Sequence, residues 1–350
     1  MVTHNKLQSA KPYLNGSRSM TDLGIFWHRP RAWIGSESVN RTGLQILRAA
    51  YQRLTHRPSL KSVSPELREQ AKALIESGMI VIPDFLPQEV FDKIRDEYNT
   101  AFDPNRETIV RKAEETVNKR SNKYSRDSEA ITSVLIRGVC QESCKLTAEL
   151  SPTALQHIVN NKTIWELASA ATGKKIKYRP GAYFQREKRA PDGREDTEQN
   201  ILLHEDVFYP SLKAFFYIND NTVENGAFVV VPKTQRLDIQ RLKHEYLYSL
   251  DIARQKKGKS ISHPQHESGR MQVFGRTYKK EELKEVQAVG KANTLILANT
   301  MAFHRRGGSS VDEERQQIRM CFRHVETLHH FLYPHFDTRN SKRYQATEYY

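Results

Sequence analysis

Apolar residues recur at helical spacing in several segments of the first half of the chain. Residues 44–54, 87–99 and 162–171 carry apolar side chains three or four positions apart, which is typical of amphipathic helices. A further helix is predicted from Ser64-Pro65 to Gly78, because serine can cap a helix, proline suits its first position and glycine commonly ends it. The apolar run 79–82, stopped by Pro83, predicts a short strand after that helix.

The pattern changes at Ile176 to short β-rich segments separated by turn residues such as Asn225-Gly226 and Gly307-Gly308. The predicted strands lie near residues 176–187, 199–207, 212–219, 226–231, 293–299, 301–306 and 315–323. Many short strands after a helical half predict an α+β protein whose second half is a barrel or a sandwich.

These patterns divide the chain into four parts. Residues 1–60 form an N-terminal extension to which the pattern assigns no role, and residues 61–175 are expected to be mainly helical and to pack on the core. The core spans residues 176–325 and is interrupted by a long basic insertion at about 233–292, of the kind that often forms a lid or a binding loop. Residues 326–350 form a C-terminal tail.

The chain of 350 residues is basic, with 55 Lys and Arg against 41 Asp and Glu and a formal charge of +14. A basic surface suits an acidic partner, but a cationic enzyme without such a partner would have the same composition. The run 256–259 and the charged segment 104–130 favour nucleic-acid binding, although no recognised nucleic-acid motif accompanies them. Charge alone therefore leaves both interpretations open.

The three cysteines, Cys140, Cys144 and Cys321, do not form a disulfide framework and indicate a reducing compartment. No apolar run approaches the roughly 18 residues of a membrane span, and the N-terminus lacks the apolar centre of a signal peptide. We therefore expect a cytoplasmic protein without a membrane span, and the sequence does not decide its oligomeric state.

The candidate chemistry lies in His204-Glu205-Asp206 and in the distant His304. On a strand, residues two apart point to the same face, so the side chains of His204 and Asp206 would lie together. Two imidazoles and one carboxylate are the ligand set of a non-haem Fe(II) facial triad with open coordination positions. A His-x-Asp pair taken alone is more typical of turn hydrogen bonds at a strand end than of a metal site, and a chain with 13 histidines is expected to contain about one such pair by chance.

The surroundings of these residues narrow the choice. A strand and the segment Glu224-Asn225-Gly226-Ala227-Phe228 with Val229-Val230-Val231-Pro232 follow the His-x-Asp, while a glycine pair and then Arg315 follow His304. This arrangement resembles the phytanoyl-CoA dioxygenase-like (PhyH) family of Fe(II)/2-oxoglutarate-dependent oxygenases. The resemblance covers residues 176–323 and the strand and helix near 78–98, and it implies a double-stranded β-helix (jelly-roll, cupin-like) core flanked by N-terminal helices.

The resemblance implies that His204, Asp206 and His304 are the catalytic iron ligands and that Arg315 anchors the distal carboxylate of 2-oxoglutarate. A guanidinium group suits that role because its fork grips a carboxylate with two hydrogen bonds. A surface arginine in the charged run 312–315 is the alternative for Arg315.

Strand alternation extends the candidate site. Arg319 shares a face with Arg315 and is either a second anion anchor, for substrate or cosubstrate, or the partner of a neighbouring acid. Phe215 and Tyr217 share a face of their strand and either line the cosubstrate pocket or belong to the core, and Tyr183 is a similar candidate. Arg306 departs from the family, in which a small hydroxylic residue can occupy this position, and it adds positive charge at the rim that would favour an anionic substrate.

The resemblance implies a dioxygenase that uses Fe(II), 2-oxoglutarate and O2 to hydroxylate or otherwise oxidise a C–H bond of a small, anionic metabolite, with release of succinate and carbon dioxide. The aspartate at 206 favours oxidation over halogenation, because related halogenases have a small residue at this position. Two alternatives remain: a basic nucleic-acid-binding protein and a non-catalytic family member that acts as a binding module.

Overall fold

The computed structural model describes residues 37–103, 112–113, 131–136, 139–173, 176, 180–189, 202–206, 210–256, 271–272, 277–308, 310 and 313–323. Their helices are α2 (Glu37–Arg41), α3 (Leu44–Thr55), α4 (Arg68–Ser77), α5 (Gln88–Ala101), α6 (Pro152–Ala154), α7 (Lys162–Thr172) and α8 (Ile239–Lys256), with short turns η2 (Pro65–Leu67), η3 (Leu155–Val159) and η4 (Lys280–Glu282). Their strands are β1 (Met79–Ile82), β2 (Lys112–Ala113), β3 (Ile131–Ile136), β4 (Val139–Lys145), β5 (Gly181–Arg189), β6 (His204–Glu205), β7 (Ser211–Tyr217), β8 (Phe228–Val230), β9 (Met271–Gln272), β10 (Val286–Gln287), β11 (Leu295–Asn299), β12 (His304–Arg306) and β13 (Glu314–Arg323).

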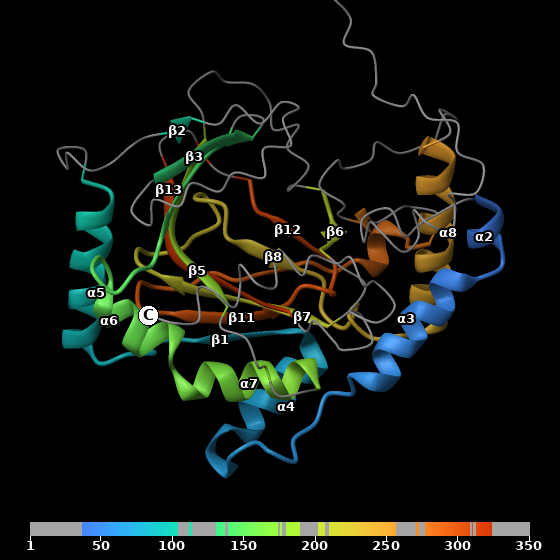
Figure 1. Ribbon diagram of the computed structural model, residues 1–350, viewed down its shortest axis with the longest axis horizontal. Helices are drawn as coiled ribbons and strands as arrows, with labels where there is room; N and C mark the ends of the chain where they lie inside the picture. Colours follow the sequence, from blue (N-terminus) through green and yellow to red (C-terminus); the bar gives the residue numbers. More distant parts are fainter. Residues whose placement is uncertain are drawn as a thin grey trace, which may run out of the picture.

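The strands form two sheets (Figure 1). The larger sheet has eight strands in the order β1-β11-β7-β13-β5-β4-β3-β2, and the smaller has five in the order β10-β8-β12-β6-β9. Pairing is antiparallel except between β2 and β3. The fold is therefore a mixture of helices and largely antiparallel sheets, as the hydrophobic pattern predicted.

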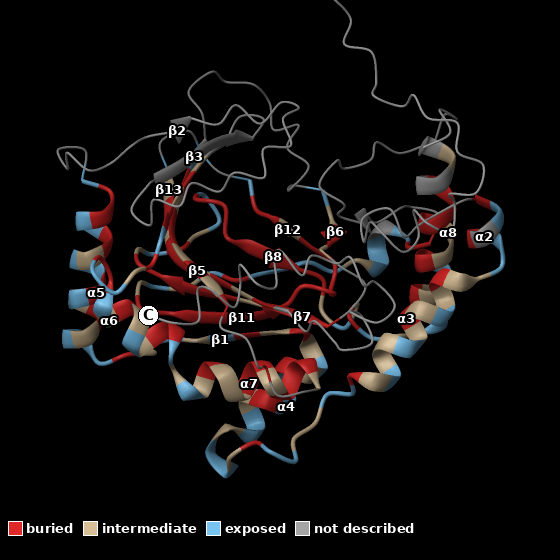
Figure 2. Ribbon diagram, viewed as in Figure 1, coloured by how far each residue is buried: buried red, intermediate tan, exposed pale blue. Residues whose placement is uncertain are grey.

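Strand β7 shows how the larger sheet separates two cores. Its even-numbered residues Leu212, Ala214 and Phe216 belong to the core shared with helices α4, α5 and α7, whereas Phe215 and Tyr217 belong to a second core. That second core also contains Phe228 and Val230 from β8, so it lies between the two sheets. Figure 2 shows the buried residues concentrated in the sheets and on the helix faces turned towards them. The alternation of side chains along β7 thus faces one set of residues to the helices and the other to the smaller sheet.

Helix α8 belongs to the basic insertion and lies beside α2 and α3, at the end of the molecule away from α5 (Figure 1). The side chain of Asn40 donates to the carbonyl of Ser249 at 2.7 Å, and Gln45 donates to Glu245 at 2.8 Å. Both contacts are buried, so they join the N-terminal extension to the insertion. Within its described residues, this insertion contains α8, which packs on the N-terminal helices, together with β9, η4 and β10.

Most predicted elements are present close to their expected bounds, with two differences. Besides the predicted strand β1, the segment 61–175 contributes β2, β3 and β4 to the larger sheet, in which β4 pairs with β5 over seven residues and β3 pairs with β4. Ser64 precedes its helix, but its side chain makes no cap hydrogen bond; its backbone N–H instead donates to Glu166. Gly78 ends α4 with a φ of 89°, in the left-handed region that glycine tolerates.

Several predicted features lie outside the described residues. They include residues 1–36, residues 114–130 of the charged segment, residues 257–259 of the basic run and residues 324–350 of the tail. Among the residues that the structure describes, no helix is both long and apolar enough to cross a membrane.

Candidate metal centre

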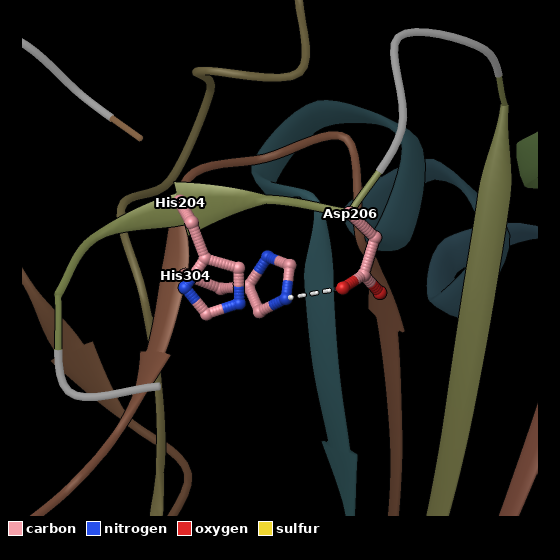
Figure 3. A group of neighbouring side chains, drawn as sticks. All are labelled: His204, Asp206 and His304. Atoms are coloured by element: carbon pink, nitrogen blue, oxygen red, sulfur yellow. Dashed lines mark ion pairs between the residues drawn. The ribbon is translucent and has the colours of Figure 1, made fainter. Parts of the chain in front are cut away.

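His204, Asp206 and His304 come together between the two sheets. His204 on β6 and His304 on β12 are opposite each other in the antiparallel pairing of these strands, and their ring centroids are 4.5 Å apart. Asp206 follows β6 directly, and its backbone N–H donates to the carbonyl of Thr300 at 3.1 Å. Each side chain offers one ligand atom, and these atoms lie within 4.8 Å of one another (Figure 3). The three residues can therefore bind one metal ion.

The hydrogen bonds of the two imidazoles leave their Nε2 atoms as the ligand positions. Nδ1 of His204 lies 2.7 Å from the carbonyl of Leu202, and Nδ1 of His304 lies 2.8 Å from that of Ala302. A carbonyl only accepts, so each Nδ1 carries the proton and each Nε2 of the neutral ring carries the lone pair. Backbone carbonyls often orient metal-binding histidines in this way.

The environment of His304 suits a metal ligand. Its Nε2 is buried, has no hydrogen-bond partner among the described residues and lies 3.7 Å from Oδ1 of Asp206, too far for a hydrogen bond. Burial lowers the pKa of the His304 imidazole against the opposing effect of Asp206, which keeps the ring neutral at pH 7. A neutral, orphaned nitrogen beside a carboxylate fits a divalent cation such as Fe(II).

Glu205 lies between the first two ligands in the sequence, and its side chain points away from the site. Its contacts hold the strand of His204 in place. Glu205 is fully buried and forms an ion pair with Arg241 of α8, with His244 of the same helix 3.9 Å from its other oxygen. Nη1 of Arg241 also donates to the carbonyls of Thr234 at 2.7 Å and Met301 at 3.0 Å. Arg241 thus connects the strand of His204 to the turn that precedes His304.

Both sheets supply side chains to the same space. Nζ of Lys213 on β7 lies 2.5 Å from Oδ2 of Asp206. The ring of Phe228, on β8 of the smaller sheet, lies 5.3 Å from that of His304, and the ring of Phe215, on β7 of the larger sheet, lies 5.2 Å from that of Phe228. The metal ligands therefore face an apolar wall on one side and an ammonium group on another.

A second charged cluster lies between the sheets, further along the strands. Glu187 on β5 forms buried ion pairs with Arg315 on β13 and with Arg306 on β12. Burial alone would raise the pKa of the Glu187 carboxyl, but the two guanidinium groups outweigh it and hold this pKa at about 2. Nη1 of Arg315 donates to the carbonyl of Gly226, whereas its buried Nε has no hydrogen-bond partner among the described residues.

With this geometry established, comparison with known families gives a clear match. The family model described as phytanoyl-CoA dioxygenase (PhyH) matches residues 74–315, which span all three candidate ligands and Arg315. The chain belongs to this family. The resemblance inferred from the His-x-Asp, the distal histidine and the following arginine is thereby confirmed. No curated protein matches the sequence of this PhyH chain significantly.

Solved structures with a similar fold include several 2-oxoglutarate complexes. EctD from S. alaskensis with 2-oxoglutarate and 5-hydroxyectoine is 16% identical over 77% of this chain and 80% of that chain, with a TM-score of 0.46. The epimerase SnoN with Fe3+, alpha ketoglutarate and nogalamycin RO is 14% identical over 73% of this chain and 83% of that chain, with a TM-score of 0.45. HygX from Streptomyces hygroscopicus with nickel and 2-oxoglutarate is 12% identical over 73% of this chain and 86% of that chain, with a TM-score of 0.40. Likenesses at this level say nothing of the chemistry of the PhyH chain.

The remaining predicted residues differ in burial and in their contacts. Arg319 is half-buried on the same face of β13 as Arg315, and its guanidinium lies 5.8 Å from the ring centre of Tyr183. Tyr217 is fully buried, and its hydroxyl donates to the carbonyl of Ala288 at 2.6 Å, which favours a core role. Arg306 is buried with Glu187 and does not lie at an exposed rim, because its side chain points between the sheets like that of His304.

Sequence reasoning missed four residues of this PhyH site: Glu187, Glu205, Lys213 and Arg241. Strand alternation could have found Glu187, since it shares a face with Tyr183, and Lys213, since it shares one with Phe215. Nothing in the sequence points to the pairing of Glu205 with Arg241, because α8 lies in an insertion whose position depends on the whole fold.

Proposed function

We propose that this protein is an Fe(II)/2-oxoglutarate-dependent dioxygenase that hydroxylates or otherwise oxidises a C–H bond of a small anionic molecule. The observation that carries the proposal is the convergence of His204, Asp206 and His304 with a buried arginine, Arg315, between the same two sheets. Membership of the PhyH family supports it. A non-catalytic binding module would not need three buried ligand atoms so close together.

Different residues of the chain would bind the iron and the 2-oxoglutarate. His204 and His304 would hold iron through Nε2 and Asp206 through a carboxylate oxygen, and Arg315 would hold the distal carboxylate of 2-oxoglutarate. When bound, iron and 2-oxoglutarate supply the activation of dioxygen, with succinate and carbon dioxide as the products of the cosubstrate. Phe215 and Phe228 would exclude water from one side of His304.

The charges around the site support an anionic substrate. Arg319 makes no ion pair among the described residues; its Nη1 lies 3.9 Å from Sγ of Cys321 and its guanidinium lies near the ring of Tyr183. A half-buried guanidinium without an acidic partner suits a carboxylate or a phosphate.

The two sheets support a double-stranded β-helix as the core of the enzyme. The eight-stranded and five-stranded sheets enclose an apolar core that contains Phe215, Phe228 and Val230, and the metal ligands lie at one end of it. In this arrangement the two histidines come from paired strands of the smaller sheet and the arginine anchor comes from the larger one.

Anaerobic titration of the purified protein with Fe(II) and then 2-oxoglutarate tests the proposal. We expect a charge-transfer absorbance that appears only when both are present, and succinate production once air and a substrate are supplied. His204→Ala should weaken metal binding on the order of 100-fold or more, because it removes a ligand from a preformed site.

The matched control is His157→Ala, a partly exposed histidine on the helical turn η3 that lies outside the site. This variant should bind metal and 2-oxoglutarate like the wild type. The proposed function is wrong if the iron-loaded wild type binds no 2-oxoglutarate, or if His204→Ala and His157→Ala bind iron equally well.

A further inference from the structure

The anchor proposed for the cosubstrate already holds a carboxylate that belongs to the protein. Glu187 forms an ion pair with Arg315, and the same oxygen, Oε2, also pairs with Arg306. The side chains of all three residues are about 8% exposed, so the cluster is largely shielded from water. A carboxylate that arrives at Arg315 must therefore share or replace the contact with Glu187.

Arg315 has donor capacity for one more carboxylate. Among the described residues, Glu187 is the acid that pairs with both guanidinium groups. The buried Nε of Arg315 has no hydrogen-bond partner among the described residues, although a guanidinium has five N–H donors. A buried donor without a partner is costly, and a second carboxylate would remove this cost.

The origin of the two arginines allows the pairs to separate. Arg315 lies on β13, opposite Glu187 in the pairing of β13 with β5, so this pair belongs to the larger sheet. Arg306 lies on β12 of the smaller sheet, two residues after the metal ligand His304 and on the same face. Glu187 can therefore lose Arg315 and still keep a cationic partner.

We propose that Glu187 is an internal competitor for the cosubstrate: it occupies Arg315 in the ligand-free protein, and the distal carboxylate of 2-oxoglutarate displaces it onto Arg306. This inference rests on the proposed function and adds to it a residue pair that sets cosubstrate affinity. Arg306 serves as the alternative partner that keeps Glu187 ionised and out of the pocket once 2-oxoglutarate is bound. The displacement changes ion pairs only and breaks no covalent bond.

Binding of two 2-oxo acids to the anaerobic, iron-loaded protein tests the competition. 2-Oxoglutarate carries the distal carboxylate, whereas 2-oxobutanoate has the same metal-binding head and lacks it. Glu187→Gln removes the competing charge with little change in shape. We therefore expect the Kd of 2-oxoglutarate to fall about tenfold, which is the size of effect that one buried interaction ordinarily has. The Kd of 2-oxobutanoate should stay within about twofold of the wild-type value.

Two further variants distinguish competition by Glu187 from other roles of this residue. Arg306→Met leaves Arg315 as the cationic partner of Glu187 among the described residues, so the Kd of 2-oxoglutarate should rise about tenfold, and Glu187→Gln in that background should restore it. Glu142→Gln is the matched control, because Glu142 is a buried glutamate that pairs with Arg186 on β5 away from Arg306 and Arg315. It should leave both Kd values unchanged.

The outcomes distinguish this inference from the function on which it rests. If the wild type binds 2-oxoglutarate and Glu187→Gln binds it no more tightly, the competition is refuted and the proposed function stands. A weaker Kd in Glu187→Gln would mean that Glu187 positions Arg315, which also refutes the competition. If neither the wild type nor Glu187→Gln binds 2-oxoglutarate, both proposals fail.

Discussion

Substitution of Arg241 by methionine should strongly destabilise the metal-free protein. The Arg241 side chain is 1% exposed and is among the largest fully buried side chains of the described residues. Methionine fills a similar length but leaves the Glu205 carboxylate, which is 0% exposed, without its guanidinium partner. The change also removes the hydrogen bonds to the carbonyls of Thr234 and Met301.

The size of the effect follows from these losses. Breaking a buried ion pair by removing one partner costs about 3–5 kcal/mol, because the remaining charge stays buried. Part of this cost is relieved if the Glu205 carboxyl takes up a proton, so we expect a loss of about 4 kcal/mol in the free energy of unfolding at pH 7. This value is a large share of the stability of an ordinary domain.

Chemical denaturation of the metal-free protein at pH 7 measures the effect. Arg95→Met is the matched control, because Arg95 pairs with Asp92 on the exposed face of α5 and should cost no more than about 0.5 kcal/mol. Adding Glu205→Gln to Arg241→Met removes the orphaned charge and should recover about 1–2 kcal/mol.

Two results would refute the reasoning. A loss below about 1 kcal/mol for Arg241→Met would mean that the buried pair contributes no more than a surface pair. A further loss on adding Glu205→Gln would mean that the orphaned carboxylate is not the source of the cost.

Three other predictions concern residues near the site. The folded-state pKa of Glu187 lies at about 2, below its ordinary value, so its ion pairs stabilise the protein above pH 4.5 and lose this effect as the pH falls towards 2. Between pH 7 and pH 3, denaturation should show the free energy of unfolding of the wild type falling by about 2 kcal/mol more than that of Glu187→Gln. Gly307→Ala should cost about 1–3 kcal/mol, because an added Cβ would lie 2.6 Å from the carbonyl of Ala227, whereas Gly308→Ala, with open space around it, should be nearly neutral in the same assay. Tyr217→Phe should cost about 1–3 kcal/mol by leaving the carbonyl of Ala288 without its donor, while calorimetry finds the Kd of 2-oxoglutarate unchanged.

The sequence predicted site residues most reliably where the alternation of side chains along a strand decides which residues share a face. His204 and Asp206 are two residues apart, and strand alternation alone places their side chains on one face. The same period grouped Arg315 with Arg319 and Phe215 with Tyr217, and the structure keeps each pair on one face. It did not reveal which face of β7 looks towards helices and which towards the smaller sheet, because that depends on the packing of both layers.

The strands of residues 131–145 show a limit of the same reasoning. They follow a highly charged segment, and the hydrophobic pattern predicted no strand at these residues. In the structure β4 pairs with β5 along its length, so these strands owe their conformation to a partner that is already in the sheet. Pairing between strands distant in sequence depends on tertiary contacts, and local propensity is a weak guide to it.

By itself, the sequence determined which residue types were available and at what spacing: a His-x-Asp, a distal histidine and an arginine eleven residues after it. Only the tertiary structure decided what stands beside them. It brought Glu187 from β5 between Arg306 and Arg315, and it placed Arg241 of α8 behind Glu205. The physical reason is that a buried charge needs a partner at a few ångströms, and the element that supplies the partner is chosen by how sheets and helices pack, wherever it lies in the chain.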